Sequence, residues 1–199
     1  VILSNITTPL LGLVDTAVVG RLPGPEYIGA VAIGATAFTG IFWMFGFLRM
    51  GTTGFVAQAA GADDFTEVRS ILTRAILISL VFGALLIGLQ QPLWYGAIEL
   101  LDPSVTVREL AEQYFSIRVW TGPATLVNYA LLGFFIGIQR PRLALVIQIW
   151  LNGVNIVLDL LFVVGLDMGV PGVAWATLIG EYSAAILGLV VVMRVLRPR

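Results

Sequence analysis

Six long apolar stretches, separated by short polar connections, constrain the fold of this chain more than any other feature. A helix that crosses a bilayer needs about 20 mostly apolar residues. Stretches of that kind lie at approximately residues 1–19, 28–58, 67–90, 107–138, 143–165 and 172–193. We therefore predict an all-α integral membrane protein in which six transmembrane helices form a single unit over residues 1–199.

The composition supports a membrane protein and excludes several functional classes. Hydrophobic residues make up 58% of the chain, charged residues 12%, and the mean hydropathy is +0.96, whereas about 25% of a soluble domain is charged. The net charge of −1 gives no reason to expect a nucleic-acid partner. All eleven basic residues are arginines, and Cys and His are absent. The commonest ligands of zinc and haem are therefore missing, and we expect no cofactor.

The connections between the stretches contain helix-breaking residues and a helix-start signal. Asp64, followed three residues later by Glu67, is typical of a capping box at the start of the third helix. Trp94 and Tyr95 follow that helix and are expected at the membrane–water interface.

The arginines predict the orientation in the membrane, since cytoplasmic loops carry an excess of positive charge. If the first helix runs outward, the outer connections contain only Arg21 and Arg108. The inner ones then contain seven: Arg69, Arg74, Arg140, Arg142, Arg194, Arg197 and Arg199. Both ends of this segment are therefore expected in the cytoplasm. The chain opens inside an apolar run, and we interpret it as a segment that begins partway through its first helix.

Acidic side chains inside the apolar stretches are the strongest functional signal. Asn155 and Asp159 lie one helical turn apart and so share a face. A carboxylic acid at the centre of a membrane helix costs roughly 2.5–3.5 kcal/mol on insertion scales and usually serves a function. Asp15 has a similar setting in the first stretch. We therefore interpret the chain as part of a transporter that works through Asp15 and Asp159.

Structural roles for the same polar residues stay open. Either acid could be a hydrogen-bonded group that only fixes the packing, and Asn155 could simply join two helices. Glu181 could face a cleft or pair with Arg118 of the fourth stretch, and we favour the ion pair. Gly133 and Gly137 form a GxxxG pattern, which is weak evidence for any particular interface in so glycine-rich a chain.

Three motifs carry a family resemblance. GLVDTAVVGRL, LRMGTTGFVAQAAGA and LNGVNIVLDLLFVVGLDMGVPGVAWATLIGEY occur in that order along the chain. Together they resemble the multidrug and toxic compound extrusion (MATE) transporters, in particular the bacterial DinF-like branch. The resemblance implies a twelve-helix transporter of the bacterial inner (plasma) membrane, with two six-helix lobes around a cleft. This chain would be the N-terminal lobe, without the C-terminal lobe.

The resemblance also implies a cation-coupling site. Its helix 1 acid matches Asp15, its helix 5 pair matches Asn155 and Asp159, and its helix 6 hydroxyl matches Thr177. A helix 4 tyrosine of the family matches Tyr114, on spacing alone. Members of the family export cationic, often aromatic compounds in exchange for H⁺ or Na⁺.

The residues themselves do not separate the two coupling ions. Two carboxylates in one low-dielectric pocket cannot both be ionised cheaply, so one acid of the pair Asp15 and Asp159 should hold a proton near neutral pH. Asn155 and Thr177 add neutral oxygens, and an all-oxygen site formed by these four residues also suits Na⁺.

Other functions fit the residues less well. A di-aspartyl intramembrane protease could use two acids, but the surrounding motifs are those of a transporter. A flippase for lipid-linked precursors would line its cavity with positive charge to bind phosphate, whereas Asp15, Asp159 and Glu181 favour cations. A channel or scaffold subunit would need a surface for partners, and the short loops offer little.

Overall fold

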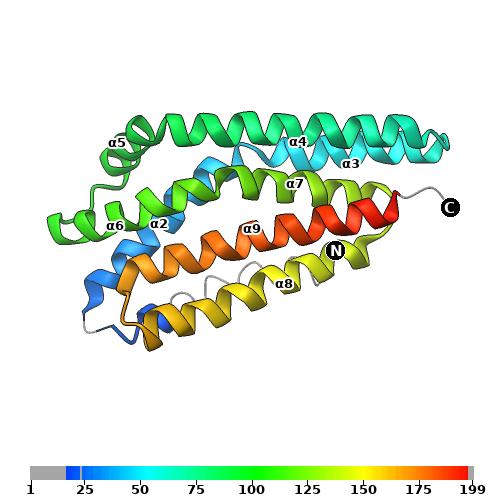
Figure 1. Cartoon of the computed structure of the whole chain (residues 1–199). Helices are drawn as coiled ribbons and strands as arrows, with labels where there is room; N and C mark the ends of the chain where they lie inside the picture. The colour runs from blue at the N-terminus through cyan, green and yellow to red at the C-terminus, as the bar shows by residue number, and fades with distance from the viewer. Residues whose placement is uncertain (1–16, 23, 197–199) are drawn as a thin grey trace.

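The computed structural model describes residues 17–22 and 24–196, and within them every regular element is a helix (Figure 1). Residues 17–19 are helical. The elements that follow are α2 (Pro25–Trp43), α3 (Gly46–Gly61), α4 (Phe65–Gly88), α5 (Gln90–Leu101), α6 (Val105–Arg118), the 3-10 turn η1 (Val119–Thr121), α7 (Gly122–Gly137), α8 (Pro141–Asp159), the π-helical η2 (Leu160–Gly165) and α9 (Gly169–Val195).

Five helical segments of the described residues are long and apolar enough to cross a membrane. They are Pro25–Gly61, Phe65–Gly88, Val105–Gly137, Pro141–Gly165 and Gly169–Val195. The prediction of an all-α membrane fold is confirmed, and these segments overlap the second to sixth predicted stretches. Nearly all of the first stretch lies outside the described residues. Many large apolar side chains, such as Leu77, Val81 and Ile186, are exposed, as expected for helices that face lipid.

Two of the segments contain a joint where a single continuous helix was predicted. Met44 and Phe45 separate α2 from α3, and η1 separates α6 from α7. Pro123 lies in the first turn of α7, where its missing N–H is tolerated. A Cβ added to Gly83 of α4 would lie 2.4 Å from the Cα of Pro123. The small residue therefore allows α4 to pack directly against the second joint.

The short helix α5 was not predicted. It turns away from the direction of α4 and leads into α6 (Figure 1). Trp94 is only 5% exposed, and its ring lies 5.2 Å from that of Phe115 of α6. Trp94 therefore packs inside the protein because α5 folds its inner face onto the bundle, and its position at the membrane–water interface stays a prediction. Tyr95, the next residue, is 60% exposed.

Polar residues in a left-handed conformation follow the helix ends in four of the connections between the predicted stretches. Asp63, Asp102, Gln139 and Asp167 have φ angles between 41° and 58°, a left-handed conformation that Asp tolerates better than most residues. Asp64 accepts a hydrogen bond from the backbone N–H of Glu67 at 2.9 Å. The predicted cap of α4 is thus present.

Two glycines of α7 seat α3 against it, in the most extensive helix–helix contact of the described residues. A Cβ on Gly133 would lie 2.6 Å from the carbonyl oxygen of Arg49 and 2.9 Å from the Cβ of Thr52. A Cβ on Gly137 would lie 2.8 Å from the side chain of Val56. The GxxxG pattern, which was weak evidence in the sequence, therefore marks a specific contact where the two backbones approach closely.

Gly133→Ala should lower the stability of the protein by about 1–3 kcal/mol, because the methyl group overlaps the α3 backbone and forces the helices apart. Gly153→Ala of α8 is the matched control, since a Cβ there meets nothing within 4 Å. Thermal unfolding of both variants of the intact protein in detergent measures the difference. Equal midpoints for the two variants would contradict the close contact.

Candidate cation site

Three of the predicted site residues meet between α8 and α9. Asn155 and Asp159 of α8 are 0% exposed, and Thr177 of α9 is 1% exposed. The amide of Asn155, oriented to satisfy both neighbours, donates to Asp159 Oδ2 at 3.1 Å, and its oxygen accepts from the backbone N–H of Thr177 at 3.2 Å. The Asn155 side chain thus joins the acid to the neighbouring helix.

The Thr177 hydroxyl completes the group. Its oxygen lies 3.3 Å from the Asn155 amide, and it can also donate to the carbonyl oxygen of Val173 at 3.0 Å. Carboxylate, amide and hydroxyl oxygens are therefore gathered in one fully buried place. Such oxygens suit a proton or a hard cation.

The backbone changes its helical type directly after Asp159. This residue ends α8, and the next six residues form the π-helical η2. Wide turns of this type often occur at functional sites, because they change the direction of side chains within an otherwise regular helix. The sequence contains no breaker between Asp159 and Gly165 that would have predicted the turn.

Tyr114 is buried on α6, with 2% exposure. Its ring packs on Gly34 of α2, where an added Cβ would lie 2.3 Å from Tyr114 Cδ1. The Tyr114 side chain therefore packs inside the protein and does not face solvent or lipid. Asp15, the remaining predicted member of the site, lies outside the described residues, so its approach to Asp159 stays a prediction.

A second buried acid lies one helical turn beyond Thr177 on α9. Glu181 is 9% exposed, and Asn128 of α7 is 5% exposed. The Asn128 amide nitrogen lies 2.7 Å from Glu181 Oε2 and 3.0 Å from the Glu181 carbonyl oxygen, and donates to both. Among the described residues, the Asn128 side-chain oxygen has no hydrogen-bond partner, and the buried Thr125 hydroxyl lies beside the Glu181 carboxylate.

The favoured ion pair between Arg118 and Glu181 is not formed. In the described part of the chain, the one ion pair within 4 Å joins Arg74 to Glu67. The Arg118 guanidinium instead donates to the hydroxyl of Thr121, and its Cζ lies 5.4 Å from the ring centroid of Phe38. Asn128 supplies the hydrogen bond to Glu181, and the aromatic ring stabilises the cation, so neither group needs the other at contact distance.

Sequence reasoning did not identify Thr125 as a neighbour of this second acid. The only available signal was its spacing, since Thr125 and Asn128 are three residues apart and share a helix face. Asn128 joins α7 to α9 through its two hydrogen bonds to Glu181.

Asn128→Leu should lower the stability by about 1–3 kcal/mol, because the buried Glu181 carboxylate loses its amide donor. Adding Glu181→Leu should recover part of that loss, since two apolar side chains leave no unsatisfied group. Thermal unfolding of the two single variants and the double variant of the intact protein measures this coupling. Strictly additive effects would show that the two side chains do not interact.

Comparison with known proteins identifies the family. Residues 1–161 match the MatE family. The chain is 44% identical over 198 residues to the DNA damage-inducible protein F of Escherichia coli K12, covering 100% of this chain and 43% of that protein. It is 20% identical over 192 residues to the multidrug export protein MepA of Staphylococcus aureus MSSA476, covering 96% of this chain and 43% of MepA.

Solved structures agree with this assignment. An outward-facing MATE family transporter superposes with a TM-score of 0.84 at 25% identity, over 93% of this chain and 41% of that chain. An inward-facing one superposes with a TM-score of 0.82 at 24% identity, over 90% of this chain and 41% of that one. The chain thus spans less than half the length of these relatives. It belongs to the MatE family, whose members are membrane transporters and not enzymes.

Proposed function

We propose that this chain is the N-terminal lobe of a cation-coupled antiporter that exports cationic, often aromatic compounds. The observation that supports the proposal most is the buried group of Asn155, Asp159 and Thr177. It lies in a chain that is similar over almost its whole length to a protein named as a multidrug exporter. A second lobe, of which this chain contains no counterpart, would complete the cleft.

The physical basis of the coupling is the cost of a buried charge. An ionised carboxylate removed from water is strongly unfavourable unless a cation or several donors compensate it. Asp159 accepts a hydrogen bond from the Asn155 amide at 3.1 Å, and a proton or Na⁺ would neutralise its charge. Loss of the proton or Na⁺ would leave Asp159 negatively charged and able to bind a cationic substrate. The coupling ion and the substrate therefore compete for the same negative charge.

Transport requires that the coupling ion and the substrate stabilise different conformations, because a ligand with equal affinity for both conformations shifts nothing. We propose that the first helix, which carries Asp15, moves against α8 and α9 when either acid is neutralised. The substrate is then released outside, and the return step delivers the coupling ion inside. That relatives have been solved facing outward and facing inward supports two such conformations.

A balance of charge favours cationic over anionic substrates. Asp159 and Glu181 are buried, and Arg118 is held on the ring of Phe38. Positive charge directed into the lobe would be expected for a transporter of phosphorylated precursors.

Asp159→Asn should abolish efflux of a fluorescent aromatic cation driven by an ion gradient, because the amide cannot take up and release a cation. Asp15→Asn should do the same. Asp167→Asn is the control, since Asp167 lies in the turn after η2 in a left-handed conformation that Asn also tolerates. Efflux from vesicles that contain the intact protein, driven separately by a pH gradient and by a Na⁺ gradient, identifies the coupling ion. Normal efflux from either site variant would refute the proposal.

The proposed orientation can be tested with single cysteines introduced into this part of the protein, which contains none of its own. Ala62 and Ser104 are exposed and lie in connections on opposite sides of the segment Phe65–Gly88. In intact spheroplasts, a membrane-impermeant maleimide should label Ser104→Cys, while Ala62→Cys should react only after permeabilisation. The reverse labelling pattern would place both ends of the 199-residue chain outside the cytoplasm.

A further inference from the structure

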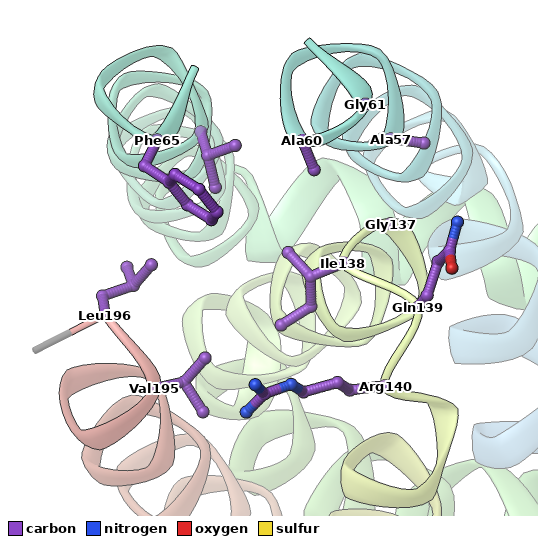
Figure 2. A pocket seen from close by; sticks show the side chains of 11 residues that line it. Ala57, Ala60, Gly61, Phe65, Gly137, Ile138, Gln139, Arg140, Val195 and Leu196 are labelled. Carbon is purple, nitrogen blue, oxygen red and sulfur yellow. The ribbon is translucent and has the colours of Figure 1, made fainter. Parts of the chain in front are cut away.

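A cavity of about 340 Å³ opens at the end of the bundle opposite η2 (Figures 1 and 2). Residues at or beside the ends of all five membrane-length segments border it, from Gly61 and Phe65 through Gly137 and Arg140 to Val195. The cavity therefore lies where the helices leave the apolar layer, at the depth of lipid headgroups.

The side chains that line the cavity are mostly apolar, apart from those of Gln139 and Arg140. Ala57 and Ala60 of α3, Phe65 of α4 and Leu196 after α9 line it. Figure 2 shows the Phe65 ring pointing inward and the Arg140 side chain extending across the cavity toward Val195. An apolar hollow crossed by one cationic side chain matches a molecule with an anionic end and an apolar body.

The positive charge in the cavity is not compensated. Within the described residues, the Arg140 side chain has neither a hydrogen bond nor an ion-pair partner, and none of the residues that line the cavity is acidic. Arg69 adds a second guanidinium at the rim, where it donates to the carbonyl oxygen of Leu196.

Of the acids nearby in the chain, Asp64 caps α4 and Glu67 pairs with Arg74 at 3.4 Å, while Asp63 of the α3–α4 turn does not line the cavity. Two helices, α4 and α8, begin beside the cavity, and three, α3, α7 and α9, end there. Their dipoles therefore add no net positive field, and the positive charge comes from the guanidinium groups.

We propose that this cavity binds the headgroup of an anionic glycerophospholipid. The phosphate lies against Arg140, the glycerol backbone fills the hollow, and the acyl chains leave along the apolar walls toward the bilayer. Basic pockets between membrane helices are suited to such headgroups, and a guanidinium binds phosphate oxygens in a bidentate manner.

A lipid bound here would contact the α3–α4 turn, the α7–α8 turn and the end of α9, where Arg69 already donates to the carbonyl oxygen of Leu196. It would therefore stabilise the arrangement of helix ends on this side of the lobe. The site is at the opposite end of α8 from Asp159, so its occupation is separate from binding at the cation site.

Native mass spectrometry of the intact protein in an uncharged detergent tests the proposal. Phosphatidylglycerol should bind saturably and more tightly than phosphatidylcholine with the same acyl chains. Arg140→Gln should weaken phosphatidylglycerol binding about fivefold, the effect of one cation near an anionic headgroup. Arg142 lies two residues further along the chain, is exposed and does not line the cavity. Arg142→Gln removes the same charge and should change binding less than about twofold.

Two further measurements test the cavity itself. Ala60→Phe should fill the hollow and abolish tight binding while Arg140 is kept, with thermal unfolding used to verify that each variant is folded. Glycerol 1-phosphate, which lacks acyl chains, should bind far more weakly than the lipid. Equal losses for Arg140→Gln and Arg142→Gln, unchanged binding by Ala60→Phe, or equal affinity for phosphatidylcholine or glycerol 1-phosphate would each overturn the proposal.

Discussion

The centre of this lobe depends on hydrogen bonds from buried amide side chains to buried acids. Asp159 is bonded to Asn155, and Glu181 is bonded to Asn128. In an apolar layer without water, a polar group must find its partner within the protein. Because Asn155 also contacts Thr177 of α9, and Asn128 donates to α9 as well, these two pairs fix α9 between α7 and α8. The groups that could carry ions are therefore also groups that hold the helices together.

Small residues determine how closely the helices approach. Gly133 lies against the backbone of α3, Gly83 lies against Pro123, and Gly34 lies under the ring of Tyr114. Inside a membrane the hydrophobic effect does not favour contact between helices over contact with lipid, so close packing of the backbones provides much of the free energy of association. These contacts place α6 and α7 in the middle of the bundle, where Tyr114 and Asn128 reach the interior.

Local patterns were enough to predict much of the fold and part of the site. Apolar length predicted the spans, and the αL conformations of Asp63 and Asp102 fall at connections that the breaker residues had marked. The spacing of Asn155 and Asp159 correctly predicted a shared face. The packing of Trp94 on Phe115 was not predicted, because an aromatic residue after an apolar stretch has the same local pattern whether or not the chain folds back as α5. The predicted ion pair between Arg118 and Glu181 was wrong for a similar reason. The sequence shows two opposite charges but does not show that Phe38 contacts the arginine and Asn128 the acid.

The sequence by itself determined that the chain is a membrane-spanning helical protein with acids at membrane depth, because hydropathy, length and residue spacing are local properties. Only the tertiary structure decided which polar groups meet. Asn155 and Thr177 are 22 residues apart, and Asn128 and Glu181 are 53 apart, so their contacts depend on how α7, α8 and α9 pack. The cavity beside Arg140 likewise exists only where the ends of several helices converge, an arrangement that packing between distant segments creates and that no single stretch encodes.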